Sequence, residues 1–193
     1  MSTSTKTKLH MNIRALCEGA LMVAAAQVLG YLKLFGSLSA GGSITFAMFP
    51  ICFYAARWGL GKGLLTAFAF GLLQLLLDGA YTWGWESIIL DYLLGFGALG
   101  LAGVFHKKSW GIFPGIVLGC LVRLACGFTS GLLLLCGNFE PTALPVFGTI
   151  GNVTLYSFLY NASYIIPCMI LALAVAGVLY KPLNKYFTGQ DLK

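Results

Sequence analysis

Six runs of apolar residues, separated by short polar stretches, constrain the fold of this chain more than any other feature. They lie at about 12–32, 44–56, 60–78, 87–105, 111–136 and 154–180. Only 9% of the residues are charged, against about 25% in a typical soluble domain. A bilayer core about 30 Å thick needs roughly 20 apolar residues for each spanning helix. The sequence therefore predicts an all-α integral membrane protein with six transmembrane helices, of which the second is short.

The basic residues indicate how these helices are oriented. One set of helix ends carries Lys6, Lys8, Arg14, Arg57, Lys62, Lys107, Lys108, Lys181, Lys185 and Lys193, whereas the opposite set carries only Lys33. Because lysine and arginine gather in cytoplasmic loops, the sequence predicts that both termini lie in the cytoplasm. It also predicts one membrane domain, 1–193, with basic tails at about 1–11 and 182–193. The glycine- and serine-rich stretch 36–43, in the first outer loop, suits a flexible lid.

Several function classes find no support in the sequence. It contains no nucleotide-binding motif, no Ser/His/Asp set, no paired catalytic carboxylates and no His-rich cluster. The six cysteines lie in or near apolar segments without a CxxC spacing, so we interpret them as small buried side chains. The net charge of +6 gathers at helix ends and does not form a nucleic-acid-binding patch. We expect no catalytic residue, no enzyme activity, no cofactor, no metal and no nucleic-acid partner.

One carboxylate stands inside a predicted span. Asp91 lies between Ile88-Ile89-Leu90 and Tyr92-Leu93-Leu94, about one turn below the outer surface. An aspartate at the centre of a membrane helix costs about 2.5–3.5 kcal/mol, and less near the edge, so such residues face a cavity or a partner. Asp91 is therefore a candidate anionic contact in an outward-facing pocket. The alternative is an aspartate that snorkels to the surface or forms an ion pair.

The sixth apolar segment has one polar face. At 100° per residue, Tyr156, Ser157, Tyr160, Asn161 and Tyr164 fall within an arc of about 140°. Such a face favours contact with protein or ligand over contact with lipid, and we interpret it as the lining of a pocket. Two alternatives stay open: the tyrosines could belong to the interfacial aromatic belt, and the asparagine could bond a neighbouring helix.

Three further features lead to narrower hypotheses. The loop 78–86 carries Tyr81, Trp83 and Trp85, which could stack on a flat or cationic ring or belong to the interfacial belt. Arg123 lies in the middle of the fifth span, and we predict a structural ion pair between it and Glu18 in the first. The spacing of Ala20 and Ala24 permits close approach of another helix, although it is common by chance in an alanine-rich segment.

Five stretches of the sequence match the pattern of one known family. They are Gly41-Gly42-Ser43-Ile44 through Pro50, Arg57-Trp58-Gly59-Leu60-Gly61-Lys62-Gly63-Leu64, Leu90-Asp91-Tyr92 to Gly103, Arg123 to Ser130-Gly131, and Tyr156-Ser157 to Tyr160-Asn161-Ala162-Ser163-Tyr164. Through them the sequence resembles the substrate-binding S components of bacterial energy-coupling factor (ECF) transporters, specifically those for thiamine. The resemblance covers nearly the whole chain, with the same number and order of spans.

This resemblance implies a multi-pass protein of the bacterial cell membrane that binds thiamine near its outer face. It implies as partners a membrane T component, contacted through Ala20 and Ala24, and two cytoplasmic ATPases that drive uptake. It places Asp91, Tyr81, Tyr92, Tyr156 and Asn161 at substrate-binding positions, and the polar face adds Tyr160 and Tyr164.

The sequence departs from the family pattern at three positions. Gly127 stands where the family has a histidine, Leu135 where it has an aromatic residue, and Gly41 where some members have a tryptophan. The ligand could accordingly be thiamine itself, a precursor or analogue of it, or another small heterocyclic vitamin. A membrane sensor or a structural helical bundle that does not transport anything is the alternative from a different class.

Overall fold

The computed structural model of the chain describes residues 2–34, 42–77, 84–136, 140–144 and 147–192. Its elements, in chain order, are α1 (Ser2–Tyr31), α2 (Met48–Trp58), α3 (Leu60–Leu77), α4 (Trp85–Ser87), the π-helix η1 (Ile88–Gly95), the 3-10 helix η2 (Ala98–Phe105), α5 (Ile112–Leu135), β1 (Thr142–Leu144), β2 (Gly148–Ile150), α6 (Val153–Phe187) and the short 3-10 helix η3 (Gln190–Leu192). Within these residues the regular structure is helical, apart from one two-stranded antiparallel hairpin, β1–β2, between α5 and α6.

Five helical stretches are long and apolar enough to cross a membrane. They are His10–Tyr31, Leu60–Leu77, Trp85–Phe105, Ile112–Leu135 and Val153–Leu192. The predicted second span is also helical, but α2 has only 11 residues, which at 1.5 Å per residue is about 16 Å. That is roughly half of the 30 Å hydrocarbon core. The structure is therefore that of a helical membrane protein with five full-length spans and one shorter helix among the described residues.

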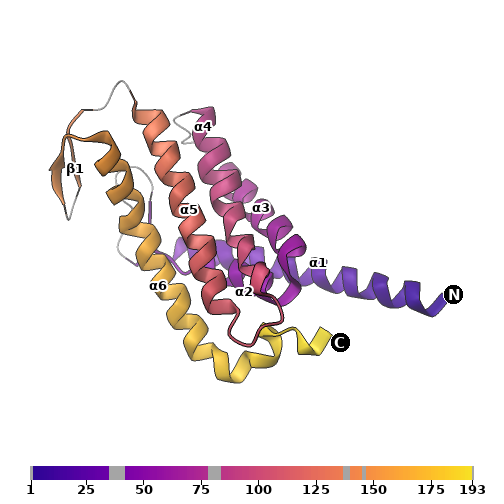
Figure 1. Ribbon diagram of the computed structural model, residues 1–193. Coiled ribbons are helices and arrows are strands. Elements are labelled where there is room, and N and C mark those ends of the chain that lie inside the picture. Colours follow the sequence, from indigo (N-terminus) through magenta and orange to yellow (C-terminus); the bar gives the residue numbers. More distant parts are fainter. Residues whose placement is uncertain (1, 35–41, 78–83, 137–139, 145–146, 193) are drawn as a thin grey trace.

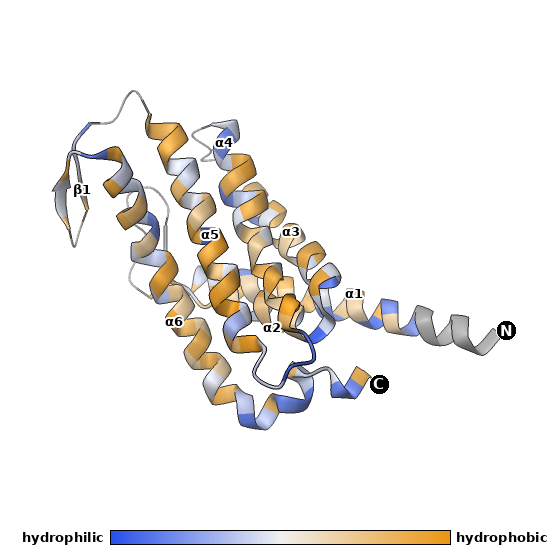
Figure 2. Ribbon diagram, in the orientation of Figure 1, coloured by the Kyte–Doolittle hydropathy of each residue, from blue (hydrophilic) through white to orange (hydrophobic). Residues whose placement is uncertain are grey.

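The short helix α2 lies at the centre of the bundle. It packs against α1, α3, η2, α5 and α6, and its side chains Ile51, Cys52 and Ala55 are fully buried. In Figure 1, α3, α5, α6 and the helical run from α4 to η2 lie at similar inclinations, whereas α1 crosses them and its N-terminal part extends beyond the bundle. Figure 2 shows apolar residues along the helices and hydrophilic ones gathered near the C-terminus and the turn before α5.

Glycines allow the helices around α2 to approach closely. A Cβ at Gly100 would lie 2.6 Å from the backbone of Leu64, and one at Gly103 would lie 2.6 Å from the backbone of Gly59. No side chain fits at such distances, so these positions of η2 must be glycine for the observed contact with α3. The resulting packing holds η1 and η2 as one wall of the bundle beside α5.

The predicted ion pair between Glu18 and Arg123 is wrong. Glu18 accepts hydrogen bonds from Arg57 (2.8 Å from Nε) and from Arg14 (2.9 Å from Nε). Asp191, beyond the end of α6, bonds the same Arg57 at 2.6 and 2.7 Å. The reason is the course of α1, which packs against α2 and α3 and so brings Glu18 to the C-terminal end of α2.

Arg57 is the centre of this charged cluster, defined by Arg14, Glu18, Arg57 and Asp191. Its side chain is only 5% exposed, yet it lies outside the five spans. Burial by itself lowers the pKa of the guanidinium, but the hydrogen bonds to Asp191 and Glu18 outweigh burial and the pKa lies above its ordinary value. The cluster therefore ties α1, α2 and the C-terminal segment together as a fully charged group.

Candidate binding site

The polar face of α6 forms as the sequence predicts. Asn152 begins the helix, and its Oδ1 accepts a hydrogen bond from the backbone nitrogen of Thr154 at 2.9 Å. The rings of Tyr156 and Tyr160 stack with centroids 6.1 Å apart, and those of Tyr160 and Tyr164 meet edge to face at 5.7 Å. Three successive turns of α6 thus present a continuous column of tyrosines. Tyr156, at the N-terminal end of the column, packs against the β1–β2 hairpin.

Asn161 lies in the middle of this face and bonds its neighbours on α6. Its Oδ1 accepts from the Tyr164 hydroxyl at 2.8 Å, and its Nδ2 donates to the backbone oxygen of Ser157 at 3.0 Å. A Cβ at Gly127 of α5 would collide with Asn161 Oδ1. The amide therefore fills the space in front of Gly127, and α5 and α6 touch at this level.

Asp91 is held by two hydroxyl groups from different elements. Its Oδ2 accepts from Ser87 at 2.7 Å, one turn earlier, and from Ser130 of α5 at 2.6 Å. Both serines are buried. Both of these bonds are made to the same carboxylate oxygen. Within the described residues Asp91 forms no ion pair, and the π-helix η1, a local winding often found at functional sites, carries it.

The serines were not foreseen, although one of them left a signal in the sequence. Ser87 stands four residues before Asp91, a spacing that places two side chains on the same helix face. Ser130 could not be found in this way, because only the packing of α5 against η1 brings it to the carboxylate.

A second charged side chain, Arg123, points into the same region from α5. Its Cζ lies 3.7 Å from the centroid of the Phe96 ring, which is a close cation–π contact. Tyr92 in turn lies against Phe96, with centroids 6.2 Å apart. Ser130, which bonds Asp91, and Gly127, which faces Asn161, lie one turn apart on α5. The structure thus gathers several of the predicted site residues, namely Asp91, Tyr156, Tyr160, Asn161 and Tyr164, between η1, α5 and α6, whereas Tyr92 lies on η1 beside Phe96.

The segment that precedes α2 reaches the tyrosine column. The backbone nitrogen of Gly42 donates to the Tyr160 hydroxyl at 2.9 Å, and that of Thr45 donates to Cys168 Sγ at 3.4 Å. The remainder of the predicted lid, 36–41, and Tyr81 lie outside the described residues. Trp85, predicted to stack on a ligand or to lie in the belt, is 69% exposed.

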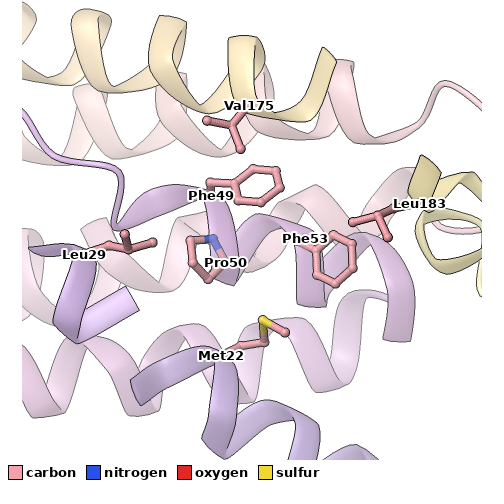
Figure 3. A pocket seen from close by; sticks show the side chains of 7 residues that line it. All are labelled: Met22, Leu29, Phe49, Pro50, Phe53, Val175 and Leu183. Carbon is pink, nitrogen blue, oxygen red and sulfur yellow. The ribbon is translucent and has the colours of Figure 1, made fainter. Parts of the chain in front are cut away.

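A separate groove of about 330 Å³ runs between α1, α2 and α6. It is lined by Met22, Leu29, Phe49, Pro50, Phe53, Val175 and Leu183, whose side chains surround it in Figure 3. None of these side chains carries a charge, hydroxyl or amide, so the groove offers nothing to the hydrogen-bonding groups of a polar ligand. The tyrosine column with Asp91 and Arg123 is the better candidate for a small polar molecule.

In the part of the chain that the structure describes, no three His, Cys, Asp or Glu side chains come together as a metal site.

Comparison with known proteins gives one consistent result. Residues 16–188 match the family model described as "Thiamine transporter protein (Thia_YuaJ)". The thiamine transporter ThiT of Bacillus subtilis is 31% identical, over 86% of this chain and 89% of that protein. ThiT of Lacticaseibacillus paracasei is 28% identical over 95% of both chains. The solved structure of ThiT from Listeria monocytogenes superposes with a TM-score of 0.75 at 23% identity, covering 91% of this chain and 98% of that one.

Proposed function

The chain belongs to the thiamine transporter protein family, and from this premise we propose that it binds thiamine from the outer side of the membrane as the S component of an ECF transporter. Members of this family are multi-pass proteins of the bacterial plasma membrane that bind a substrate for transport and are not enzymes. The similarity extends over nearly the whole chain, so it includes every element that contributes to the site.

The observation that carries the proposal is the carboxylate of Asp91. It lies inside a membrane-spanning helix, and two buried hydroxyl groups hold one of its oxygens. Thiamine has a permanently cationic thiazolium ring and an aminopyrimidine with N–H donors. A carboxylate beside a column of tyrosines and an amide offers charge, stacking faces and hydrogen bonds to both rings.

The proposal is tested by thiamine binding to the detergent-purified protein, followed through its tryptophan fluorescence. Asp91→Asn keeps the shape of the side chain and removes its charge. Hydrogen bonds to charged groups contribute about 1.5–3 kcal/mol, so the dissociation constant should rise by roughly 10- to 100-fold. Glu140→Gln is the matched control, because it removes the same charge from an exposed position beside the outer hairpin, and it should leave affinity unchanged.

Two outcomes of this experiment would contradict the proposal in different ways. Equal affinities of wild type and Asp91→Asn would remove Asp91 from the site. No thiamine binding by folded wild-type protein would reject thiamine as the substrate, and the separate pyrimidine and thiazole halves would then be screened.

We also propose that the exposed face of α1 docks onto a membrane T component. Two cytoplasmic ATPases bound to that component would supply the energy for uptake. On α1 the buried residues Ala15, Gly19 and Ala26 share one side, whereas Ala20 and Ala24 lie near the middle of the exposed side. Two small residues one turn apart allow another helix to approach closely. Since the sequence has no nucleotide-binding motif, the energy for uptake must come from such partners. The lysine and arginine distribution supports cytoplasmic termini for the docked protein.

Co-purification tests the docking. Ala20→Leu and Ala24→Leu together should abolish recovery of T and ATPase subunits while thiamine affinity stays at the wild-type value. The control variant replaces Leu16 and Val28, which lie on the same exposed face, with isoleucine. Unchanged recovery of the partner subunits with both alanines replaced would contradict the assignment.

A further inference from the structure

The turn between η2 and α5, together with the adjoining part of α6, carries positive charge that no carboxylate neutralises. Lys107 and Lys108 are exposed in this turn, and Lys181 is exposed on α6. We call these three residues the lysine corner. All ion pairs within the described residues have Arg14 or Arg57 as the cation, so none of the three lysines takes part in one there. Figure 2 shows hydrophilic residues at this turn and near the C-terminus.

Hydrogen bonds fix this turn against α2 and α6. His106 Nδ1 lies 2.8 Å from the backbone oxygen of Ala56, in hydrogen-bond contact. The Tyr180 hydroxyl lies 2.7 Å from Ser109 Oγ and donates to the Ser109 backbone oxygen at 2.8 Å. Among the described residues Lys107 is the only one other than glycine with a positive φ, 71°. Such a conformation persists where the surrounding structure determines it, so the two lysines of the turn stand on a fixed base.

Trp110 indicates that the lysine corner lies at the depth of the lipid headgroups. Its ring stacks on that of Tyr180, with centroids 4.9 Å apart, and its side chain is nevertheless 66% exposed. It stands two residues before Ile112, where the membrane-spanning stretch of α5 begins. Tryptophan and tyrosine gather where the bilayer meets water, because their rings are apolar at one end and polar at the other. The three lysines are therefore at the level of the lipid phosphates.

Exposed apolar side chains continue from the lysine corner toward the bilayer core. Val104, three residues before Lys107, is 50% exposed and belongs to the membrane-spanning stretch that ends at Phe105. Val178 is 78% exposed, and Lys181, three residues later, is the first charged residue of α6. In both places a lysine follows an exposed valine at the end of an apolar segment. This surface, charged at one end and apolar along the rest, matches the two parts of a phospholipid.

We propose that the lysine corner binds the headgroup of an anionic phospholipid, with an acyl chain along the exposed valines of η2 and α6. Basic clusters at the ends of membrane helices attract anionic lipids, and each lysine near the surface adds to the attraction. A zwitterionic headgroup carries its own cation and gains less from three lysines. A soluble phosphate lacks the acyl chain that would cover the valines. The inference does not depend on what the chain transports.

Native mass spectrometry of the detergent-purified protein tests the proposal, with dioleoyl-phosphatidylglycerol as the anionic probe and dioleoyl-phosphatidylcholine as the zwitterionic one. Wild type should bind phosphatidylglycerol at least about tenfold more tightly. Lys107→Gln with Lys108→Gln should weaken phosphatidylglycerol binding roughly 10- to 30-fold and leave phosphatidylcholine binding within about twofold. The matched control, Lys62→Gln with Lys185→Gln, removes the same charge outside the corner and should leave both affinities within about twofold.

Further variants separate recognition from misfolding, which the thermal unfolding midpoint of each protein reports. Lys107→Arg with Lys108→Arg keeps both charges and should keep phosphatidylglycerol affinity within about twofold. If the glutamine pair does not fold, Lys181→Gln tests the corner from α6 without altering the turn, and it should weaken phosphatidylglycerol binding about fivefold.

Three outcomes would overturn the proposal. The first is equal affinity of wild type for the two lipids. The second is an equal loss of phosphatidylglycerol binding in the corner and control variants, which would mean that net charge alone attracts the lipid. The third is complete displacement of phosphatidylglycerol by millimolar glycerol phosphate, because the corner would then recognise a phosphate without its lipid.

Discussion

The charged cluster around Arg57 allows a stability prediction with a worked magnitude. Arg57 donates four hydrogen bonds of 2.6–3.2 Å to Glu18 and Asp191. Arg57→Met keeps the length of the side chain but removes all four bonds, and it leaves two carboxylates that only Arg14 still neutralises. Removing one partner of a buried ion pair costs about 3–5 kcal/mol.

The loss here should lie at the lower end of that range. The carboxylate side chains remain 25% and 18% exposed and keep Arg14 as a partner, so we expect about 3 kcal/mol. For a chain of this size each kcal/mol lowers Tm by roughly 2–4 °C, which gives a decrease of about 6–12 °C for the Arg57→Met variant. Intrinsic fluorescence during heating of the detergent-purified protein measures the change.

Arg14→Met is the matched control for this prediction. Arg14 belongs to the same cluster, but its side chain is 42% exposed, and exposed ion pairs contribute only about 0–1 kcal/mol. Its Tm should therefore fall by less than about 4 °C. Equal shifts for the two variants, or a shift below 2 °C for Arg57→Met, would refute the reasoning that burial makes Arg57 the centre of the cluster.

The remaining predictions concern glycines within the helices, two at close contacts and one in open space. Gly127→Ala places a Cβ against the Asn161 oxygen, so it should displace the amide from Tyr164 at a cost of about 1 kcal/mol for the lost hydrogen bond. A titration should then show thiamine binding about fivefold weaker. Unchanged affinity would contradict the proposed role of Asn161. Gly100→Ala forces η2 away from the backbone of α3 and should lower Tm by several degrees, since overpacking costs about 1–3 kcal/mol. Gly177→Ala, with nothing within 4 Å of the added carbon, should instead raise Tm slightly, and a decrease as large as that of Gly100→Ala would show that steric contact is not the cause.

The sequence was sufficient wherever one helix by itself determines the outcome. Periodicity on α6 placed Tyr156, Tyr160, Asn161 and Tyr164 on one face, and the hydrophobic runs located every long helix. The sequence was insufficient wherever two elements must meet. Glu18 was assigned to Arg123 by counting depth along straight helices, but α1 crosses the bundle and delivers it to Arg57. Depth along one helix does not determine which neighbour lies beside it.

The same limit applies to the departures from the family pattern. A glycine at position 127 in place of a histidine suggests, from the sequence alone, that a ligand contact is missing. In the structure Asn161 Oδ1 occupies the space directly in front of Gly127, held there by the Tyr164 hydroxyl and the Ser157 backbone oxygen. A histidine could not coexist with the amide in this position, so the glycine and the placement of Asn161 depend on each other. A polar group therefore still stands at this level of the site, supplied by α6 instead of α5. Loss of the histidine alone consequently gives no reason to expect a smaller ligand, and the search for the substrate should begin with intact thiamine.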